Sequence, residues 1–175
     1  MRRTILFIAL AAIAVGCNGK NEADTTSQTK QVAMALPVSY SSSFEMGKSQ
    51  DAAAAVVQGS WKDWQDANMG NMKNWMADSV VLLMSDNKRI VGIDSAMAEW
   101  KRARSKYSNV IDTINAVLPV YSKDKKENWV LVWATEMNTS LEGKKDTMQV
   151  METWRINKDG KADLVMQYDR HSRKM

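Results

Sequence analysis

Glu152 is the residue of this sequence whose type and surroundings are most typical of chemistry. It lies in the segment Val150-Met151-Glu152-Thr153-Trp154, within a strand predicted over residues 144–156. A carboxyl group on the apolar face of a strand loses hydration, and this loss raises its pKa. Titratable groups shifted in this way are typical of functional sites. The alternative is structural, with Glu152 paired to an arginine or placed at a polar end of the fold.

The side chains that share a face with Glu152 define a predicted pocket. If residues 142 and 143 form a two-residue turn, Trp133 lies opposite Glu152, and the large apolar residues of both strands share one face. A three-residue loop at 158–160 extends this face onto the last strand. Trp64 from a predicted helix and Met84 from a predicted inner strand complete the set. The predicted ligand-binding residues are Trp64, Met84, Trp133, Glu152, Trp154, Met166 and Tyr168.

The rarity of cysteine and histidine excludes several kinds of site. The chain has 1 Cys and 1 His, too few for a disulfide framework, a zinc site of several such ligands or most His-dependent triads, unless a partner chain supplies the rest. The sequence also has no glycine-rich phosphate loop and no Gly-x-Ser-x-Gly motif. We therefore predict no cofactor and no metal. His171 follows the last predicted strand, and we expect it to be exposed and inert.

The charge of the chain argues against nucleic acid as a partner. The formal net charge is +4, and it falls to +2 if Arg2 and Arg3 are removed with a leader peptide. An excess of this size does not make a basic face for nucleic acid. The basic clusters at 102–106 and 123–126 are interleaved with polar and acidic residues, so we interpret them as solvated surface.

The beginning of the chain has the pattern of an export signal. Arg2 and Arg3 precede an apolar run over residues 5–15, and small residues follow. The run is too short to span a bilayer, which needs about 20 apolar residues, so we predict a signal peptide over 1–17. The segment Ala14-Val15-Gly16-Cys17 resembles the lipobox of bacterial lipoproteins, with Ala where Leu is usual.

The resemblance to a lipobox implies a lipid anchor at Cys17, which would be the acylated first residue of the mature chain. Asn18 stands where inner-membrane lipoproteins carry Asp, which implies the outer membrane. The side of the membrane that the anchored domain faces stays open, and an ordinary signal peptide is the alternative. Residues 18–47 have the polar composition of a flexible tether, and a single domain follows over 48–175.

Hydrophobic periodicity predicts helices first and long strands afterwards. It indicates a helix over 50–66, a short helix ending near Asp78, and a third helix opening at Gly92 with Asp94 as its cap. Before them, an apolar patch is either an edge segment of the domain or unstructured: Val38, Tyr40, Phe44 and Met46. The predicted strands cover residues 79–84, 89–91, 107–121, 128–139, 144–156 and 161–170. This order is typical of an α+β fold with its helices on one face of a bent sheet.

Three motifs in this order resemble the nuclear-transport-factor-2-like (NTF2-like) superfamily, which includes ketosteroid isomerase and the SnoaL-like polyketide cyclases. They are Trp75-Met76-Ala77-Asp78-Ser79-Val80-Val81, Ile90-Val91-Gly92-Ile93-Asp94-Ser95-Ala96 and Asn157-Lys158-Asp159-Gly160-Lys161. The resemblance covers about residues 51–170. It implies a cone-shaped fold in which three N-terminal helices pack on a strongly bent antiparallel sheet around a pocket. It also implies dimerisation through the outer face of the sheet, but no particular reaction.

Within that resemblance, Glu152 falls where ketosteroid isomerases carry a protonated acid that stabilises an oxyanion. Ser60 stands where those enzymes have a hydrogen-bonding tyrosine, and Met84 stands where they have the general base. The known isomerisation route therefore lacks two of its groups here. Asp86, near the end of the same strand, is the open candidate for a replacement base.

The sequence thus favours a binding protein without catalytic activity, whose ligand is a small apolar molecule or a protein partner. One alternative is an enzyme of the isomerase, dehydratase or cyclase type that uses Glu152 with another base. A second alternative is a structural homodimer whose interface is the smaller, more polar sheet face, containing Val130, Val132, Ala134 and Met151.

Overall fold

The computed structural model describes residues 44–46 and 50–171, which form two α-helices, one 3-10 turn and a seven-stranded sheet. The helices are α1 (Gln50–Gln65) and α2 (Ile93–Arg104), and the 3-10 turn is η1 (Met72–Asn74). The strands are β1 (Phe44–Met46), β2 (Met76–Leu83), β3 (Arg89–Val91), β4 (Tyr107–Ser122), β5 (Glu127–Ser140), β6 (Lys145–Ile156) and β7 (Ala162–His171). The predicted signal peptide with Cys17 lies outside the described residues, as does the predicted tether apart from 44–46.

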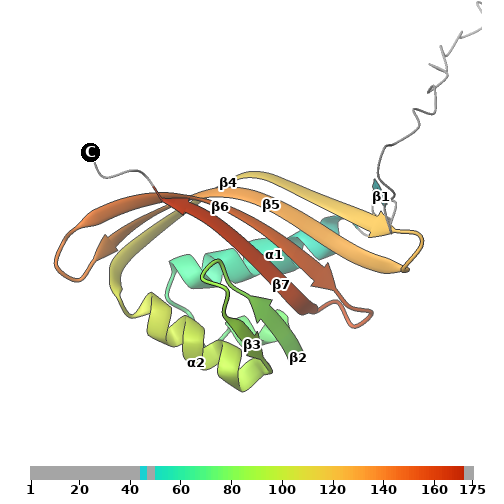
Figure 1. Ribbon diagram of the computed structural model, residues 1–175, viewed down its shortest axis with the longest axis horizontal. Coiled ribbons are helices and arrows are strands. Elements are labelled where there is room, and N and C mark those ends of the chain that lie inside the picture. Colours follow the sequence, from blue (N-terminus) through green and yellow to red (C-terminus); the bar gives the residue numbers. More distant parts are fainter. Residues whose placement is uncertain (1–43, 47–49, 172–175) are drawn as a thin grey trace, which may run out of the picture. The chain divides into compact units, whose positions relative to one another are not determined.

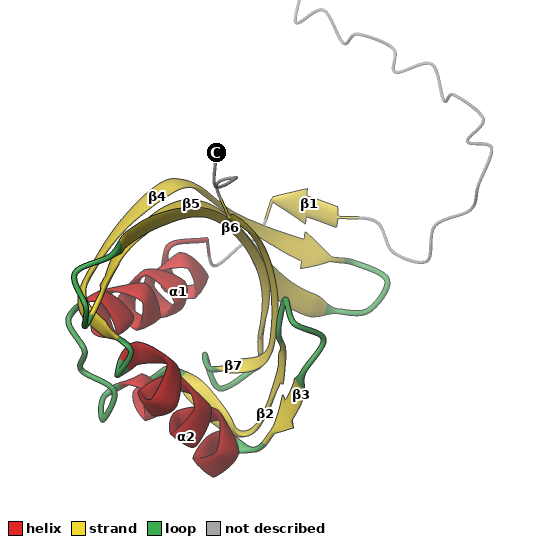
Figure 2. Cartoon of the chain, turned by 60° about the vertical axis from the view of Figure 1, so that its left-hand side comes forward, coloured by secondary structure: helices red, strands yellow, loops and turns green. Residues whose placement is uncertain are grey.

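The sheet has the strand order β1-β4-β5-β6-β7-β2-β3 and is strongly curved, with α1 and α2 on its concave side (Figures 1 and 2). This confirms the predicted α+β class and the bent sheet. The sheet is mixed, however, because β2 runs parallel to β7, while the other neighbouring strands are antiparallel. Residues 44–46 pair with β4, so this part of the apolar patch is an edge strand.

The second predicted helix is replaced by the single turn η1, and Met76, Ala77 and Asp78 begin β2 instead. The sheet captures the chain at this point, because the Ala162 N–H donates to the Trp75 carbonyl at 2.9 Å and Met76 pairs with Ala162. Trp75 also packs closely on α1, where a Cβ built on Gly59 would lie 2.5 Å from the indole ring. The described residues therefore contain two α-helices rather than three.

Helix α2 begins through backbone geometry rather than through the predicted cap. Gly92 is the N-cap, with φ of +84°, and makes no side-chain capping bond, while Asp94 lies in the first turn. At the other end, the buried Arg104 guanidinium donates hydrogen bonds of 2.8–3.0 Å to the backbone carbonyls of Trp64, Gln65 and Tyr107. A cation at these carbonyls satisfies the C-terminus of α1 and fixes it to the start of β4.

The hairpin between β5 and β6 has a three-residue loop, not the predicted two-residue turn. The Ser140 N–H donates to the Lys144 carbonyl at 2.8 Å, and Gly143 has φ of +81°, as expected for the bulge glycine of such a loop. The additional loop residue shifts the register by one, so Glu152 pairs with Val132 rather than with Trp133. A shift of one residue exchanges the two faces of a strand.

The inner face of β5 is therefore the one that carries small side chains. Val130, Val132 and Ala134 are at most 1% exposed, whereas Trp133 is 37% exposed on the convex side. The predicted inner position of Trp133 is wrong, because small side chains on this face leave room for α1. The predicted dimer face is wrong for the same reason, since three of its four members are buried in the core.

The hairpin between β6 and β7 has the predicted three-residue loop, with Gly160 at φ of +73°. Directly after it, the pairing shifts between Ile156 and Arg155, which leaves Asp163 as an additional residue on β7. Asp163 accepts a bond from the Arg155 guanidinium at 2.7 Å, and this ion pair holds the bulge. The shift again exchanges faces, so the predicted inner positions of Met166 and Tyr168 are wrong.

Candidate functional site

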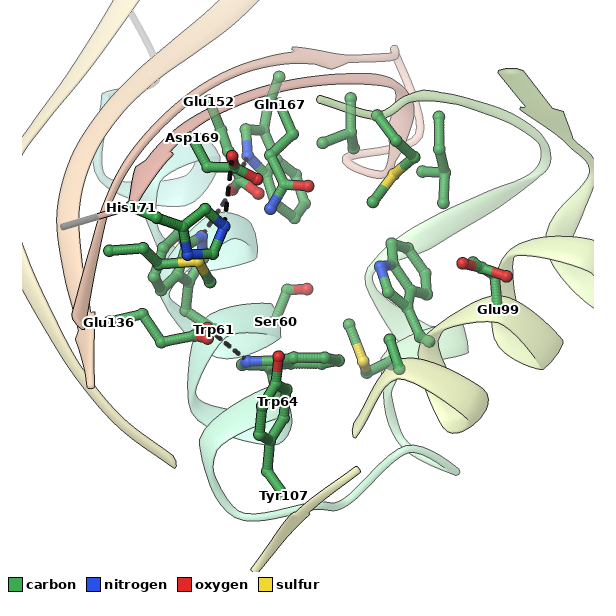
Figure 3. A pocket seen from close by; sticks show the side chains of 18 residues that line it. Ser60, Trp61, Trp64, Glu99, Tyr107, Glu136, Glu152, Gln167, Asp169 and His171 are labelled. Atoms are coloured by element: carbon green, nitrogen blue, oxygen red, sulfur yellow. Dashed lines mark hydrogen bonds and ion pairs between the residues drawn. The ribbon is translucent and has the colours of Figure 1, made fainter. Parts of the chain in front are cut away.

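A cavity of about 230 Å³ opens between the concave face of the sheet and the helices α1 and α2 (Figure 3). Four indole rings provide most of its apolar wall. Trp61 and Trp64 come from α1, Trp100 from α2 and Trp154 from β6. The spacing of three residues between the first two places both on one side of the helix. The cavity is therefore an aromatic chamber made by helices and sheet together.

Glu152 is buried in this wall, with 8% of its surface exposed. The indole N–H groups of Trp61 and Trp154 both donate to the Glu152 Oε2 atom at 2.8 Å. Burial raises the pKa of Glu152 to about 7, although the two indole bonds favour the ionised form and oppose that rise. The side chain thus combines an apolar setting with a near-neutral pKa, as predicted, while its partners are indoles rather than an arginine.

Glu136 is a second buried carboxylate of the cavity, with 3% of its surface exposed. The Trp64 indole donates to Oε2 at 2.8 Å, and the Asn138 amide donates to Oε1 at 3.3 Å. Burial raises the pKa of Glu136, and these bonds work against the shift. Both oxygens of Glu136 are therefore occupied by neutral donors.

The rim of the cavity is formed by the end of β7, where Gln167, Asp169 and His171 face inward at alternate positions (Figure 3). The His171 Nδ1 atom lies 2.9 Å from Asp146 of β6, and its Nε2 atom lies 3.7 Å from Asp169. His171 is exposed, as predicted, but it lies within β7 and lines the cavity. The last strand thus brings an imidazole and a carboxylate to the same opening.

The structure brings together four of the seven residues predicted for the pocket. Trp64, Met84, Glu152 and Trp154 line the cavity. Trp133, Met166 and Tyr168 lie on the convex face, because of the two shifts in register. Other lining residues were not predicted from the sequence, among them Trp61, Glu99, Trp100, Glu136, Gln167, Asp169 and His171. The sequence did contain a usable signal. A buried carboxylate needs hydrogen-bond donors, and the chain has several tryptophans on its predicted helices and acids on its predicted strands, so these tryptophans were candidate donors to these acids.

Ser60 and Met84, which the sequence resemblance aligned with catalytic groups of ketosteroid isomerases, carry no ionisable group. Ser60 is 2% exposed and lines the cavity, as does the thioether of Met84. Asp86 lies in the exposed turn after β2, where it pairs with Lys88 at 2.5 Å. Asp86 therefore does not replace the missing base within the cavity.

Asp112 is a further, partly buried carboxylate, on β4 directly opposite Glu136. Both of its carboxylate oxygens are buried and accept no hydrogen bond, and burial raises its pKa to about 7, with Glu136 and Glu152 adding to the rise. Asp112 lines a separate open groove between α1 and β4 rather than the cavity. Across residues 44–46 and 50–171, no group of three or more His, Cys, Asp or Glu side chains could hold a metal ion.

No protein-family model matches the sequence, and no curated protein matches it. Solved structures do match. An LEH-like epoxide hydrolase from Mycobacterium tuberculosis is 16% identical, with a TM-score of 0.56 over 69% of this chain and 84% of that chain. A hypothetical protein with a ketosteroid isomerase-like fold from Catenulispora acidiphila, in complex with trimethylamine, is 13% identical, with a TM-score of 0.54 over 65% and 83%.

A third match is an NTF2-like protein of unknown function from Exiguobacterium sp. 255-15. It is 14% identical, with a TM-score of 0.55 over 65% of this chain and 97% of that chain. The domain therefore has the NTF2-like α+β fold that the sequence motifs implied. Identities at this level show the fold alone, so the chemistry of the site has to be argued from its own residues.

Proposed function

We propose that this protein is a lipid-anchored binding protein of the bacterial cell envelope, whose NTF2-like domain holds a small, largely apolar ligand without transforming it. The aromatic cavity around Glu152 carries this proposal. Sites for small molecules are concave, mainly apolar, and contain a few polar groups that orient the ligand. The volume of about 230 Å³ is below the roughly 300–1,000 Å³ typical of drug-sized ligands. This size favours a compact ligand.

Two further observations support binding over catalysis. The Catenulispora protein with the same fold was solved in complex with trimethylamine, a small molecule with three methyl groups. In addition, the sequence resemblance aligns Ser60 and Met84, which both line the cavity, with the tyrosine and the base of ketosteroid isomerases. A cavity with the acid but without the other two groups fits retention of a ligand better than proton transfer by that route.

The lipid anchor and the outer-membrane location rest on the sequence pattern that ends at Cys17. The structure describes no helix that is long and apolar enough to cross a membrane. Labelling with a radioactive or alkyne-tagged fatty acid, compared between the native chain and a Cys17→Ser variant, tests the anchor. Labelling that persists in the variant would contradict it.

The convex face of the sheet supports a homodimer as the form in which the domain works. Ile111, Trp133, Met137 and Tyr168 are between 37% and 60% exposed on neighbouring strands of this face. Exposed apolar groups that gather in this way mark interaction surfaces. A second copy of the chain is the proposed occupant.

A hydrolase or isomerase activity is the second candidate function, and the near-neutral pKa of Glu152 favours it. A group with a pKa near 7 can donate or accept a proton at physiological pH. This candidate predicts turnover that Glu152→Gln abolishes, with a pH dependence centred near 7. Binding of a ligand that is recovered unchanged would count against it.

Native mass spectrometry of the purified protein tests the main proposal, because one spectrum reports a bound small molecule and the number of subunits. We expect an additional small mass that denaturation releases. A matched pair of variants locates the site, since Trp154→Leu alters the cavity wall and Trp133→Leu alters only the convex face. Loss of the additional mass in Trp133→Leu but not in Trp154→Leu would contradict the proposed site. If the protein never carries a small molecule, the binding proposal is left with a protein partner as the ligand.

A further inference from the structure

The polar lining of the cavity is dominated by carboxylates. Glu99, Glu136, Glu152 and Asp169 line it, and the structure places no lysine or arginine of residues 44–46 and 50–171 among the lining side chains. Glu99 forms ion pairs with Arg102 and Lys88. The other three carboxylates have no lysine or arginine partner among the described residues. When these three carboxylates ionise, their charge is therefore not balanced by a lysine or arginine of the described residues.

Arg104 is a further arginine near the cavity, and its guanidinium already has partners. Arg104 lowers the pKa of Glu136 and of Asp112 to some degree. Its guanidinium, however, binds three backbone carbonyls at the C-terminus of α1 and at the start of β4, and it does not line the cavity. Arg104 stabilises the frame of the site and leaves the lining carboxylates to attract other positive charge.

Three of the four indole N–H groups at the cavity already donate to carboxylates of the protein. The N–H groups of Trp61 and Trp154 point to Glu152, and the N–H group of Trp64 points to Glu136. These three side chains therefore offer a ligand their ring surfaces and no hydrogen-bond donor. The face of an indole carries negative electrostatic potential and attracts cations.

Glu152 keeps one acceptor for a ligand. Both indole bonds end on Oε2, and the Oε1 atom accepts no hydrogen bond from the described residues. The side chain lines the cavity, and neither of its oxygens is among the fully buried, unpaired atoms of the described residues, so we take Oε1 as the oxygen that a ligand in the cavity can reach. A ligand that donates a hydrogen bond or carries positive charge can bind to this oxygen.

We infer that the ligand is a small organic cation, a protonated or quaternary amine whose alkyl groups lie against the four indole rings and whose charge lies beside Glu152. This inference rests on the proposed binding function and names the class of ligand for it. Aromatic rings combined with a carboxylate are the general solution for quaternary ammonium recognition. The cavity of about 230 Å³ accommodates a head group of this kind with a short chain.

The same lining disfavours other ligand classes. An anion would meet Glu136, Glu152 and Asp169 without a lysine or arginine from the described part of the chain to balance its charge. A bare metal ion would need several close carboxylate or imidazole ligands, and no such group of three occurs among residues 44–46 and 50–171. A neutral apolar molecule would fit the rings but leave Glu152 Oε1 without a partner.

Three molecules of nearly the same shape test the inference by isothermal titration calorimetry on the full-length protein. Choline is the cation, 3,3-dimethylbutan-1-ol is the neutral equivalent, and 3,3-dimethylbutanoate is the anion. We expect choline to bind at least tenfold more tightly than the neutral alcohol and the anion to bind weakest. Equal or tighter binding of the alcohol or the anion would overturn the cation inference and still support a ligand site. Absence of binding for all three, in protein that also carries no co-purified molecule, would overturn both.

Two variants locate the preference within the cavity. Glu152→Gln keeps the shape and one oxygen for the indole donors, so choline should lose its tenfold advantage while the neutral alcohol keeps its affinity. Glu142→Gln, in the exposed loop between β5 and β6, removes the same charge far from the lining residues and should leave the ratio unchanged. A ratio that is unaltered in Glu152→Gln would contradict the role of this carboxylate, provided that circular dichroism shows both variants folded.

Discussion

The strands β5, β6 and β7 bury acids on their concave face and expose large aromatic side chains on their convex face. Hydrophobicity alone suggests the opposite arrangement. The concave face carries small aliphatic side chains together with carboxylates, such as Val132, Glu136 and Glu152, all of them buried. The convex face carries Trp133 and Tyr168, which are 37% and 60% exposed. The space available against α1 therefore decides which face is inside, more than the polarity of the residues.

Each face also solves a different problem. Inside, the acids are tolerated because indole and amide groups donate hydrogen bonds to them, as Trp61 and Trp154 do for Glu152. Outside, aromatic and methionine side chains remain in contact with water unless a partner covers them. The side chains of the concave face thus find their partners within one chain, apart from those at the cavity. The convex face keeps exposed apolar side chains, which the proposed second copy of the chain would cover.

The largest effect should come from placing a charge on each face in turn. Ala134 is 1% exposed on the concave side of β5, so Ala134→Lys buries an unpaired ammonium and should destabilise the domain by about 4 kcal/mol or more. Thr135→Lys, one residue further along on the convex side, removes hydrogen bonds with Asn115 and Gln149 and should cost only about 1 kcal/mol of the free energy of unfolding. Urea denaturation of both variants checks the comparison. Similar stabilities would show that the assignment of faces is wrong.

A second effect concerns the acids of the concave face and pH. Burial raises the pKa of Glu152 to about 7, so the folded state keeps a proton between roughly pH 4.5 and 7 that the unfolded state has lost. Stability should therefore fall as pH rises through this window and level off above it, by at most about 3 kcal/mol for this residue. The charge of Glu136 adds to the rise at Glu152, and the pKa of Asp112 is itself raised to about 7, so Asp112 contributes a decrease of the same sign.

Substitutions of single acids separate the contribution of Glu152 to the pH dependence of stability from the contributions of other groups. Glu152→Gln should flatten the decrease in melting temperature between pH 5 and pH 8, and Asp112→Asn should flatten the remainder in part. Exposed Asp86, whose pKa is lowered by its bond with Lys88, provides the control, because Asp86→Asn should leave this decrease in place. A wild-type protein that is more stable at pH 8 than at pH 5 would contradict the assigned direction.

A third and smaller effect belongs to the convex face. Trp133→Lys combined with Tyr168→Lys should weaken self-association by about tenfold to a hundredfold, because aromatic anchors dominate the energy of interfaces. The melting temperature of the monomer should change little, since both side chains are substantially exposed. Sedimentation equilibrium across a range of protein concentrations measures the association. A wild-type chain that is monomeric at every concentration would remove the proposed dimer.

The smallest effect tests the loop that sets the register between the faces. Gly143 has φ of +81° with open space around it, so Gly143→Ala strains only the backbone. We expect a loss of about 1 kcal/mol in the free energy of unfolding. Glu142→Ala in the same loop serves as the comparison and should cost less. Thermal denaturation of both variants distinguishes them.

Much of the fold was predictable because its signals are local. The ends of α1, α2 and the long strands follow from periodicity, and the turns at 86–87 and 158–160 follow from Asn, Asp and Gly. The order of elements, together with the three short motifs, was sufficient to indicate the NTF2-like fold. Wrong predictions lie where a distant segment decides, as at Met76, which joins the sheet through Ala162 rather than extending a helix.

The site was predictable only where position along the chain sufficed. Glu152, Trp154, Trp64 and Met84 were placed correctly in the cavity, since the pairing of β6 with either register leaves Glu152 and Trp154 on one face. Trp133, Met166 and Tyr168 were misplaced because one loop residue and one bulge decide their faces. Neither feature has a signal in hydrophobicity, and the assumption that the largest apolar residues point inward chose the wrong register.

The two hairpins also differ in how they respond to a change in length. In the loop 141–143, inserting or deleting one residue would turn β6 over relative to β5, and the acids of the cavity would exchange places with the residues of the convex face. Beside the loop 158–160, the bulge at Asp163 already absorbs one residue. Related chains that keep this cavity should therefore vary the first loop in steps of two residues, while single insertions accumulate next to the second.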